Sequence, residues 1–410
     1  MTSPSPHRTL LRTRAGRVVA GANVVLLLAV AISLAVLWPR ADAAGRPPSS
    51  LGNAVGAEVA SITPGDCEDY AGPGCRVLGI RLLEGPDKGR DSFVTVADDR
   101  FTPRFEISDR IRVTRSRTDT EAADAPGGPE LDRPEAQPYA FVDFERRAPL
   151  AVLVLLFGGL VILLARWQGL RALAGLGVSL IVVVLFVAPA ILEGRPPLLI
   201  AVVGGLAVMA ATMGLTHGLG LKSQAALLGV ALSLLLIALL GTLAVDAAQI
   251  TGLSEDTALL LNASGGNVVS LRGLVLAGLV IGALGVLDDV TVSQASTVLA
   301  LRRVNPELGA RRLFDEALTV GRDHLGATVN TLVLAYAGAA LPVLLIFSYQ
   351  GVGFGGAINF ETVAAEVVAM LVGSIGLIAA MPLTTGLAAM LAVRLPAAAL
   401  PEGDAHGHAH

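Results

Sequence analysis

Eight long apolar runs constrain the fold of this chain more than any other feature of its sequence. A helix needs about 20 apolar residues to cross a bilayer core of about 30 Å with its backbone hydrogen bonds satisfied internally. The runs therefore predict an α-helical polytopic membrane protein with about eight transmembrane helices. They lie near Val18–Trp38, Leu150–Ala165, Ala172–Leu192, Pro197–Leu215, Ser223–Val245, Leu271–Val292, Thr328–Phe347 and Val363–Val393.

The composition excludes several other classes of protein. Only 16% of the residues are charged, against about 25% in a typical soluble domain. With 4% aromatic residues and no alternating ten-residue pattern, an outer-membrane barrel is disfavoured. There is no P-loop, His-Glu-x-x-His or Gly-x-Ser-x-Gly motif, so we expect neither an enzyme nor a bound cofactor, and active transport would draw on an ion gradient. Basic residues form no stripe, so nucleic acid is not an expected partner.

The basic residues that flank the runs predict the orientation of the chain. Lys and Arg in short flanks tend to stay in the cytoplasm, and the predicted short outer loops hold only Arg195 and Arg272. The pattern predicts a multi-pass protein of the cell (inner or plasma) membrane with both termini cytoplasmic. The basic residues on the predicted inner side are Arg8, Arg12, Arg14, Arg17, Arg166, Arg171, Lys222, Arg302, Arg303, Arg311, Arg312, Arg322 and Arg394.

This orientation divides the chain into four regions. Residues 1–39 form the cytoplasmic N-terminus and first anchor, 40–147 an extracytoplasmic domain with its linker, 148–395 a seven-helix membrane block, and 396–410 a histidine-containing cytoplasmic tail. A cleaved signal peptide is an alternative for the first run, because a basic flank precedes it and small residues follow at Ala41–Ala44. Its apolar stretch is longer than a usual signal core, which favours a retained anchor.

The extracytoplasmic region carries the pattern of a small β-domain. Four runs rich in β-branched residues predict strands, and the glycines and proline of Gly85–Gly89 predict a hairpin turn. Four or five short strands favour a small barrel that resembles an OB-fold. Without aromatic platforms or a basic groove, a structural or partner-docking module is the favoured role. The strand-like runs are Ala57–Ile62, Arg76–Leu83, Ser92–Ala97 and Ile107–Thr114.

Both cysteines of the chain, Cys67 and Cys75, fall in this domain. In an oxidising compartment such a pair can close a short loop as a structural disulfide, whereas two free thiols are the alternative. The spacing and the lack of a nearby histidine make zinc unexpected, and the three histidines of the tail are weak support for a designed site. We therefore expect no metal centre.

Asp288 and Asp289 are the most informative residues, because a charge inside hydrocarbon is costly and marks a functional site by default. Asp288 follows Leu271 by about 25 Å of helical rise, which places the pair in the inner half of the bilayer. Gly282, Gly285, Asp289, Ser293 and Ser296 share one helix face, so the acids face another helix or a wet cavity. Two adjacent carboxylates repel each other when both are ionised, which suits a proton carrier. The alternative is a pair that is merely solvated at the end of a shorter helix.

A second polar cluster opens the seventh run. His324 and Thr331 share a face with Thr328 and Gly338, and Asn330 lies beside it. We expect Asn330 and Thr331 to reach roughly the depth of the aspartates. Arg322, with Asp323 beside it, is the nearest candidate counter-charge. The sequence supports equally well that Arg322 anchors the helix at the inner membrane surface and that Asp323 is a solvated neighbour.

Three stretches give the chain a resemblance to the YibE/F family of bacterial membrane proteins. They are Gly285–Ser296 (GVLDDVTVSQAS), Val320–His324 (VGRDH) and Thr328–Gly338 (TVNTLVLAYAG). The resemblance extends over nearly the whole chain, including the anchor and the β-domain with Gly85–Arg90 (GPDKGR). It implies a class of membrane protein and leaves the activity open.

The paired aspartates also give a more distant resemblance to the half-repeat of proton-driven RND exporters and their SecD/SecF relatives. In RND exporters the paired aspartates relay protons, a role that the resemblance carries to Asp288 and Asp289. Those proteins pair the acids with a basic residue in another span, and the sequence shows no Lys or Arg well inside any span here. A second subunit or Arg322 would have to supply that charge.

Two hypotheses of function follow. The first is a secondary transporter or export factor with a proton relay at the acidic pair. The second is a non-transporting membrane scaffold whose outer domain recruits an envelope partner and whose acidic pair locks helices together. The expected partners are the lipid bilayer and either further copies of the chain or a second membrane subunit, because the sequence has no internal duplication to supply a second half.

Overall fold

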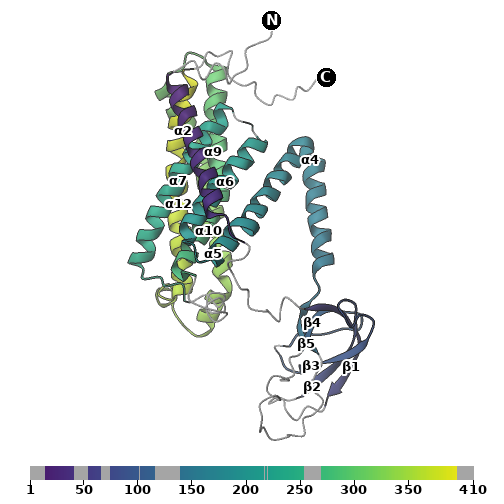
Figure 1. Cartoon of the computed structure of the whole chain (residues 1–410). Helices are drawn as coiled ribbons and strands as arrows, with labels where there is room; N and C mark the ends of the chain where they lie inside the picture. The colour runs from purple at the N-terminus through teal and green to yellow at the C-terminus, as the bar shows by residue number, and fades with distance from the viewer. Residues whose placement is uncertain are drawn as a thin grey trace. The chain divides into compact units, whose positions relative to one another are not determined.

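The computed structural model describes residues 14–40, 54–65, 74–100, 102–115, 139–216, 218, 220–253 and 269–394 (Figure 1). The chain divides into two compact units, Gly45–Leu160 and a second unit made of Met1–Ala44 with Val161–His410. The first is called the sheet unit below and the second the membrane unit. The tail 396–410 and Cys67 lie outside the described residues.

The sheet unit is a five-stranded antiparallel sheet in the order β3-β2-β1-β4-β5. The two end strands β3 and β5 also contact each other, so the sheet curls toward the partly open five-stranded barrel that the sequence predicts. Four strands overlap the predicted runs, and β5 is the fifth. The strands are β1 (Val55–Gly65), β2 (Cys75–Leu82), β3 (Asp91–Ala97), β4 (Arg110–Arg115) and β5 (Tyr139–Phe144).

Alternation along the strands builds the core of the sheet unit. Leu78, Ile80 and Leu82 of β2 are almost fully buried, and Val94 and Ile111 meet them from the neighbouring strands. Residues in between point to solvent, as the two-residue period of a strand requires. The turn between β2 and β3 has positive φ at Gly85 and Gly89, a conformation that glycine adopts without steric cost.

The membrane unit supplies the other half of the predicted fold. Among the described residues, seven helices are long and apolar enough to cross a membrane. They are α2 (Arg14–Leu37), α4 (Arg147–Val182) continued by the π-helix η2 (Val183–Val187) and α5 (Ala188–Leu192), α6 (Pro197–Thr216), α7 (Leu221–Ala247), α9 (Leu271–Val304), α10 (Ala310–Tyr349) and α12 (Glu361–Ala392). A short helix, α11 (Phe354–Ala357), precedes α12.

The count of seven differs from the predicted eight because two predicted runs share one helical segment. Arg147–Leu192 is 46 residues long, which would measure about 69 Å if straight, more than twice a bilayer core of about 30 Å. The helix is interrupted at Arg166, with φ 51° and ψ −127°. This break lies between the two predicted runs and leaves a membrane-spanning length on each side of it.

Helices α7, α9 and α12 form the centre of the bundle, with α6 and α10 packed around them. Small residues allow the close approach. Gly229 of α7 lies against Thr384 of α12, and Gly376 of α12 lies against Ile237 of α7. Leu287 of α9 is fully buried at this centre. Helix α12 continues through Pro382 without ending.

Helices α9 and α10 both extend beyond the apolar runs that predict them. The added segments pack against each other and against α7 and α12 through a second apolar cluster that includes Ala295, Val298, Leu313 and Ala317. A short connection at 305–309 joins the two helices. The hydrophobic runs mark only the lipid-spanning part of each helix, so they miss this amphipathic extension.

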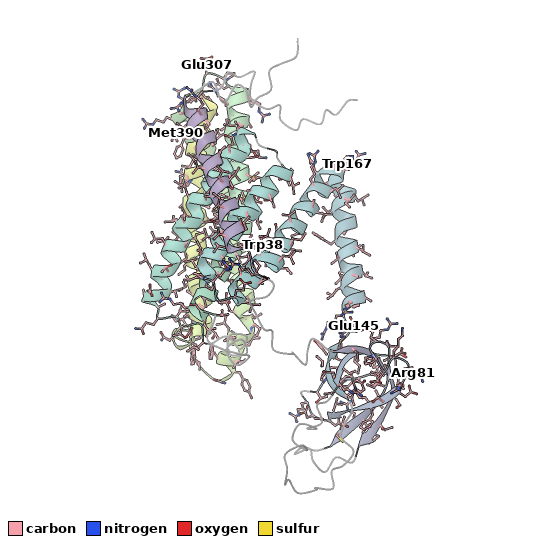
Figure 2. The ribbon with its side chains drawn as sticks, viewed as in Figure 1. Trp38, Arg81, Glu145, Trp167, Glu307 and Met390 are labelled. Atoms are coloured by element: carbon pink, nitrogen blue, oxygen red, sulfur yellow. The ribbon has the colours of Figure 1, made fainter. Side chains whose placement is uncertain are left out.

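Helix α2 is held in the bundle by specific contacts. The Asn23 side-chain amide donates to the backbone oxygens of Val19 (3.1 Å) and Gln224 (3.2 Å). Trp38, just beyond the helix, stacks on Phe186 with 5.8 Å between ring centroids (Figure 2). Arg195 donates to the carbonyl oxygens of Val36 and Trp38. These contacts favour the retained anchor, which stays a prediction.

Candidate functional site in the membrane unit

Helix α9 has two unlike faces, and the acidic residues belong to the more open one. Its apolar face is buried in the bundle centre. On the other side, Gly278, Gly282, Gly285 and Asp289 are exposed, and their spacing of four, three and four residues places them on one helix face. Ser293 and Ser296, which the sequence assigns to the same face, are half-buried, and their hydroxyls donate to carbonyls of α9 itself.

The open face meets α10 at an ion pair. The Oδ2 atom of Asp289 lies 3.3 Å from Nε2 of His324. The side chains of Asp289 and His324 are 68% and 48% exposed, so both remain accessible from outside the bundle. The contact therefore brings a carboxylate and an imidazole together from two adjacent helices.

Asp288 is half-buried, and Asp289 and Lys222 of α7 are the charged groups that influence it electrostatically. Lys222 is the second residue of α7, 66 positions away in sequence. The sequence assigns it only to the positive inner flank, because its approach to Asp288 depends on the packing of α7 on α9. Lys222 is therefore a basic neighbour that sequence reasoning missed.

Arg322 and Asp323 are not part of this contact. Both are exposed on α10, and among the described residues neither forms an ion pair. The structure therefore places His324, and not Arg322, in contact with Asp289. Because consecutive helix residues point about 100° apart, His324 faces α9 while its two predecessors do not.

Asn330 and Thr331 lie away from the acidic pair. They follow His324 by six and seven residues, which is about 9 to 10 Å of rise along α10. Both are exposed, and the Thr331 hydroxyl donates to the carbonyl of Ala327 in its own helix. Thr328 is buried instead, and its hydroxyl donates to the carbonyl of His324. The structure therefore brings together Asp288, Asp289 and His324 and leaves Asn330 and Thr331 outside.

A buried polar contact joins three helices next to the acidic pair. Gln294 of α9 is 2% exposed, and its Oε1 accepts a hydrogen bond of 2.9 Å from the hydroxyl of Thr385 in α12. Gly321 of α10 packs directly against the Gln294 amide, and a Cβ atom there would collide with it. A buried amide must be hydrogen-bonded, so this contact fixes how α9, α10 and α12 pack near Asp289.

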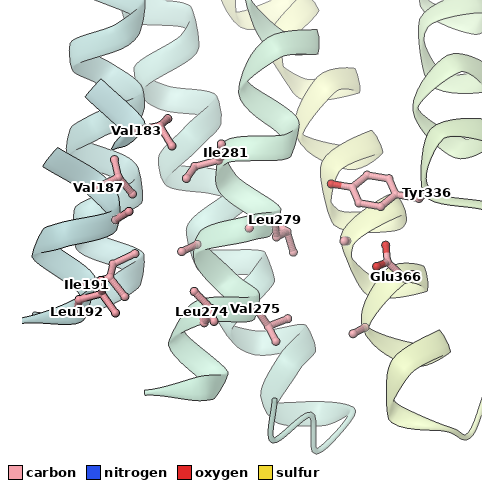
Figure 3. Close-up of a pocket in the computed structure, with 15 residues that line it drawn as sticks. Val183, Val187, Ile191, Leu192, Leu274, Val275, Leu279, Ile281, Tyr336 and Glu366 are labelled. Carbon is pink, nitrogen blue, oxygen red and sulfur yellow. The ribbon is translucent and has the colours of Figure 1, made fainter. Parts of the chain in front are cut away.

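A cavity opens beside α9, along the part of the helix that contains Gly278 and precedes the acidic pair. Its volume is about 600 Å³, and its walls come from η2, α5, α9, α10 and α12 (Figure 3). Most lining residues are Val, Leu, Ile, Ala and Gly, and the polar ones are Tyr336 and Glu366. Glu366 is half-buried and forms part of the cavity wall.

The remaining predicted sites are simpler. Among the described residues, no group of three His, Cys, Asp or Glu side chains is placed to hold a metal ion. Cys75 is buried at the first residue of β2 and takes part in a disulfide. Its predicted partner Cys67 lies outside the described residues, so the pairing itself stays a prediction.

Comparison with known proteins agrees with the membrane unit. Residues 153–394 match the YibE/F-like protein family. The matched stretch begins inside α4 and ends just after α12, so it contains the acidic pair and His324, whereas α2 and the five strands of the sheet unit lie outside it. No curated protein and no solved structure matches the chain. Because the match covers more than half of the 410 residues, the chain belongs to the YibE/F-like protein family.

Proposed function

We propose that this YibE/F-like protein is a secondary transporter or export factor in which Asp288, Asp289 and His324 relay protons. The observation that carries the proposal is the contact of 3.3 Å between Asp289 and His324 on two adjacent membrane helices. Ionisable residues inside a membrane usually face the interior of the helix bundle or a water-filled cavity. Asp289 and His324 are exposed on the open face of α9, so the relay requires a water-filled path to this face.

The two adjacent carboxylates can hold one proton between them for the relay. Two carboxylates in neighbouring positions repel each other when both are ionised, so a proton is favoured on one of them. Transfer of a proton from a carboxyl oxygen of Asp289 to Nε2 of a neutral His324 converts a neutral contact into an ion pair, and the return transfer reverses this. Both arrangements hold the same number of protons, so net proton movement requires that a proton enters the pair from one side of the membrane and leaves it on the other.

The distant resemblance to RND exporters and SecD/SecF supports the same role. There the paired aspartates of one span carry protons and a basic residue of another span completes the site. In this proposal the basic groups are His324, which the sequence names in its second polar cluster, and Lys222, which it assigns only to the inner flank. The predicted orientation, with both termini cytoplasmic, puts this site in the inner half of the bilayer.

A further subunit is also part of the proposal. Asn330 is an exposed amide on a membrane-spanning helix, and lipid cannot satisfy its hydrogen bonds. A second membrane-embedded chain on α10, either another copy or a different subunit, would cover this residue. Asn330→Leu should then lower the apparent oligomer mass in mild detergent. Adding Leu334→Asn to that variant should not restore the oligomer mass.

The proton relay is tested with the purified full-length protein in liposomes under an imposed pH gradient. A pH-sensitive dye in the lumen should report faster proton entry than in empty liposomes. Asp288→Asn and Asp289→Asn should remove this excess. Asp315→Asn, which alters an exposed carboxylate of α10 away from the pair, is the matched control. Equal proton entry in all four proteins would exclude the relay.

The scaffold is the competing function, and the sheet unit favours it because that unit has a core of its own. Deleting residues 49–117 distinguishes the two. A scaffold should lose its whole cellular phenotype, whereas a transporter keeps its proton flux in liposomes. We propose transport because an acidic pair that only holds helices together would not need to be exposed on the open face of α9.

A further inference from the structure

The cavity of the membrane unit has the length of one lipid leaflet. Its lining runs from Leu274 to Ile281 along α9 and from Leu192 back to Val183 along α5 and η2. These stretches measure about 10 and 14 Å along their helix axes. Half of a bilayer core of about 30 Å is about 15 Å, so the cavity covers most of the depth of one leaflet.

Charged residues at three helix ends mark the surface at which the cavity begins. Glu193 directly follows α5, and Arg272 and Glu361 lie in the first turns of α9 and α12. Each of them lies within about one helical turn of the cavity lining,. An elongated ligand can therefore run from the membrane surface toward the bilayer centre.

The lining of the cavity favours an apolar, uncharged occupant. Thirteen of its fifteen residues are Val, Leu, Ile, Ala or Gly, so water, which needs about two to four polar partners, is a poor occupant. The two polar residues, Tyr336 and Glu366, lie together at one side, opposite Val187 and Ile191 (Figure 3). Glu366 already takes part in an interaction within the protein, so the lining does not require a charged ligand.

The cavity opens sideways on membrane-spanning segments. Ala188, Leu192 and Gly278 line it and are exposed, and all three belong to candidate membrane spans. Nothing lies within 4 Å of the place where a Cβ atom of Gly278 would be. A chain from the surrounding lipid can therefore enter the cavity and contact the backbone of α9.

A π-helical segment shapes the apolar side. Val183 and Val187, the first and last residues of η2, both line the cavity. A π-helix is rare, and such segments occur frequently at functional sites. This observation is independent of the size and depth of the cavity, and it also points to a ligand.

We infer that this cavity binds one acyl chain of a membrane phospholipid, inserted lengthwise between η2, α5 and α9. An alkyl chain leaves no polar group unsatisfied against this lining and gains dispersion contacts along its length. The headgroup stays at the membrane surface, where the basic residues already have partners, since Arg195 pairs with Glu193 and Arg272 with Asp246. Binding should therefore depend on the chain and not on the headgroup.

The inference goes beyond the proton relay and does not depend on it, because lipid binding is measured at equilibrium without proton movement. Native mass spectrometry of the full-length protein in mild detergent, titrated with dipalmitoylphosphatidylcholine, counts the bound lipids. We expect one lipid to bind saturably before others add, with the same affinity for phosphatidylglycerol of the same chains. Dihexanoylphosphatidylcholine, whose chains are too short to fill the cavity, should bind about tenfold more weakly.

Two outcomes of this titration would overturn the inference. The first is a smooth series of lipid adducts with no preferred first lipid, as nonspecific lipid gives. The second is an affinity that is set by the headgroup and not by the length of the chain.

A matched pair of glycine variants locates the site. Gly278→Leu places a side chain in the cavity and should weaken binding of the first lipid by about tenfold or more. Gly285→Leu is the control, because Gly285 lies on the same exposed face of α9, has open space around it and is outside the cavity. Unchanged lipid binding in Gly278→Leu would overturn the assignment. A lipid-free protein dimer that Gly278→Leu dissociates would also overturn it, since a second chain would then fill the cavity.

Photolabelling places the chain itself. A phosphatidylcholine with a diazirine near the end of one chain is irradiated with the protein in nanodiscs, and peptide mass spectrometry locates the label. We expect label on residues 274–281 of α9 in wild type and its loss in Gly278→Leu. Label on Leu345, an exposed residue of α10 outside the cavity, reports the surrounding lipid and should be equal in both. Equal labelling of 274–281 in the two proteins would contradict the inference.

Discussion

The sheet unit and the membrane unit use charged side chains in opposite ways. In the sheet unit, charges are numerous and paired. Arg112 bridges Glu84 (3.1 Å) and Glu145 (3.4 Å), and Arg81 pairs with Asp91 at 2.8 Å. In the membrane unit, Asp289 and His324 form a pair far from the helix ends, on a face made otherwise of glycine. Ion pairs at a solvent-exposed surface contribute little to stability, whereas an ionisable residue inside a membrane is costly and usually marks a functional site.

The comparison gives different expectations for the two units. Removing an exposed charge from the sheet unit, such as that of Asp91, should leave stability and flux almost unchanged, and removing apolar volume should unfold it. Removing charge from α9 or α10 should leave the fold intact and stop proton movement. The variants below separate these outcomes, beginning with the largest expected effect.

Leu78→Ala should destabilise the sheet unit most. Leu78 is fully buried at the centre of β2, and truncating such a leucine costs about 2–5 kcal/mol. Hydrogen exchange on the full-length protein should show faster exchange in β1, β2 and β3, with unchanged exchange in α9 and α12. Ile107→Ala, at an exposed position, is the control. An equal change in both units would contradict their independence.

His324→Gln should lower proton entry without changing the fold. A hydrogen bond to a charged group contributes about 1.5–3 kcal/mol, which corresponds to a roughly tenfold to hundredfold loss of rate. Arg322→Gln, two residues earlier and directed away from Asp289, should keep the wild-type rate in the same liposome assay. The reverse result would return the counter-charge role to Arg322.

Gly321→Leu should destabilise the membrane unit moderately. Its side chain would collide with the Gln294 amide, and overpacking of this kind costs about 1–3 kcal/mol. Gly326→Leu, five residues later on α10 with open space around it, should be close to neutral. Thermal unfolding in detergent compares the two, and equal melting temperatures would mean that Gln294 does not fix the helix contact.

Asp91→Asn should have the smallest effect. The hydrogen bond from Arg81 lowers the pKa of the Asp91 carboxyl, so the stabilisation is present above the unfolded pKa and is lost as the pH falls through the folded pKa. Both side chains are exposed, so solvent screens the pair. The small difference from wild type in hydrogen exchange of β2 and β3 should begin to shrink below about pH 4, vanish once the pH lies below the lowered folded pKa, and also shrink in high salt. A difference that persists at low pH would show that the carboxylate charge is not its cause.

Much of the fold follows from local patterns in the sequence. Apolar runs locate the membrane helices because the period and length of each run are local properties, and alternation with turn glycines does the same for β1 to β4. The extension of α9 and α10, and β5, depend on packing between distant parts of the chain, whereas the joining of two apolar runs in one helical segment broken at Arg166 leaves no signal in the runs themselves. Those features are therefore missing or shifted in the sequence prediction.

The candidate site divides in the same way. Asp288 and Asp289 stand out in the sequence because any carboxylate in so apolar a run is conspicuous. The sequence also names His324, in a second polar cluster, but its contact with Asp289 appears only once α10 packs on α9, and the sequence assigns Lys222 only to the inner flank. Asn330 and Thr331 share the period of the polar face but are turned outward in the structure. Gln294 and Thr385 resemble ordinary helix residues until their mutual contact is seen.

The central claim is that the acidic pair carries protons rather than holding the fold together. The most direct test measures proton entry and thermal unfolding on one preparation of the double variant Asp288→Asn with Asp289→Asn. The account predicts that protein-dependent proton entry disappears while the melting temperature stays within about 2 °C of wild type. A melting temperature that falls by many degrees, with proton entry per folded molecule unchanged, would contradict it.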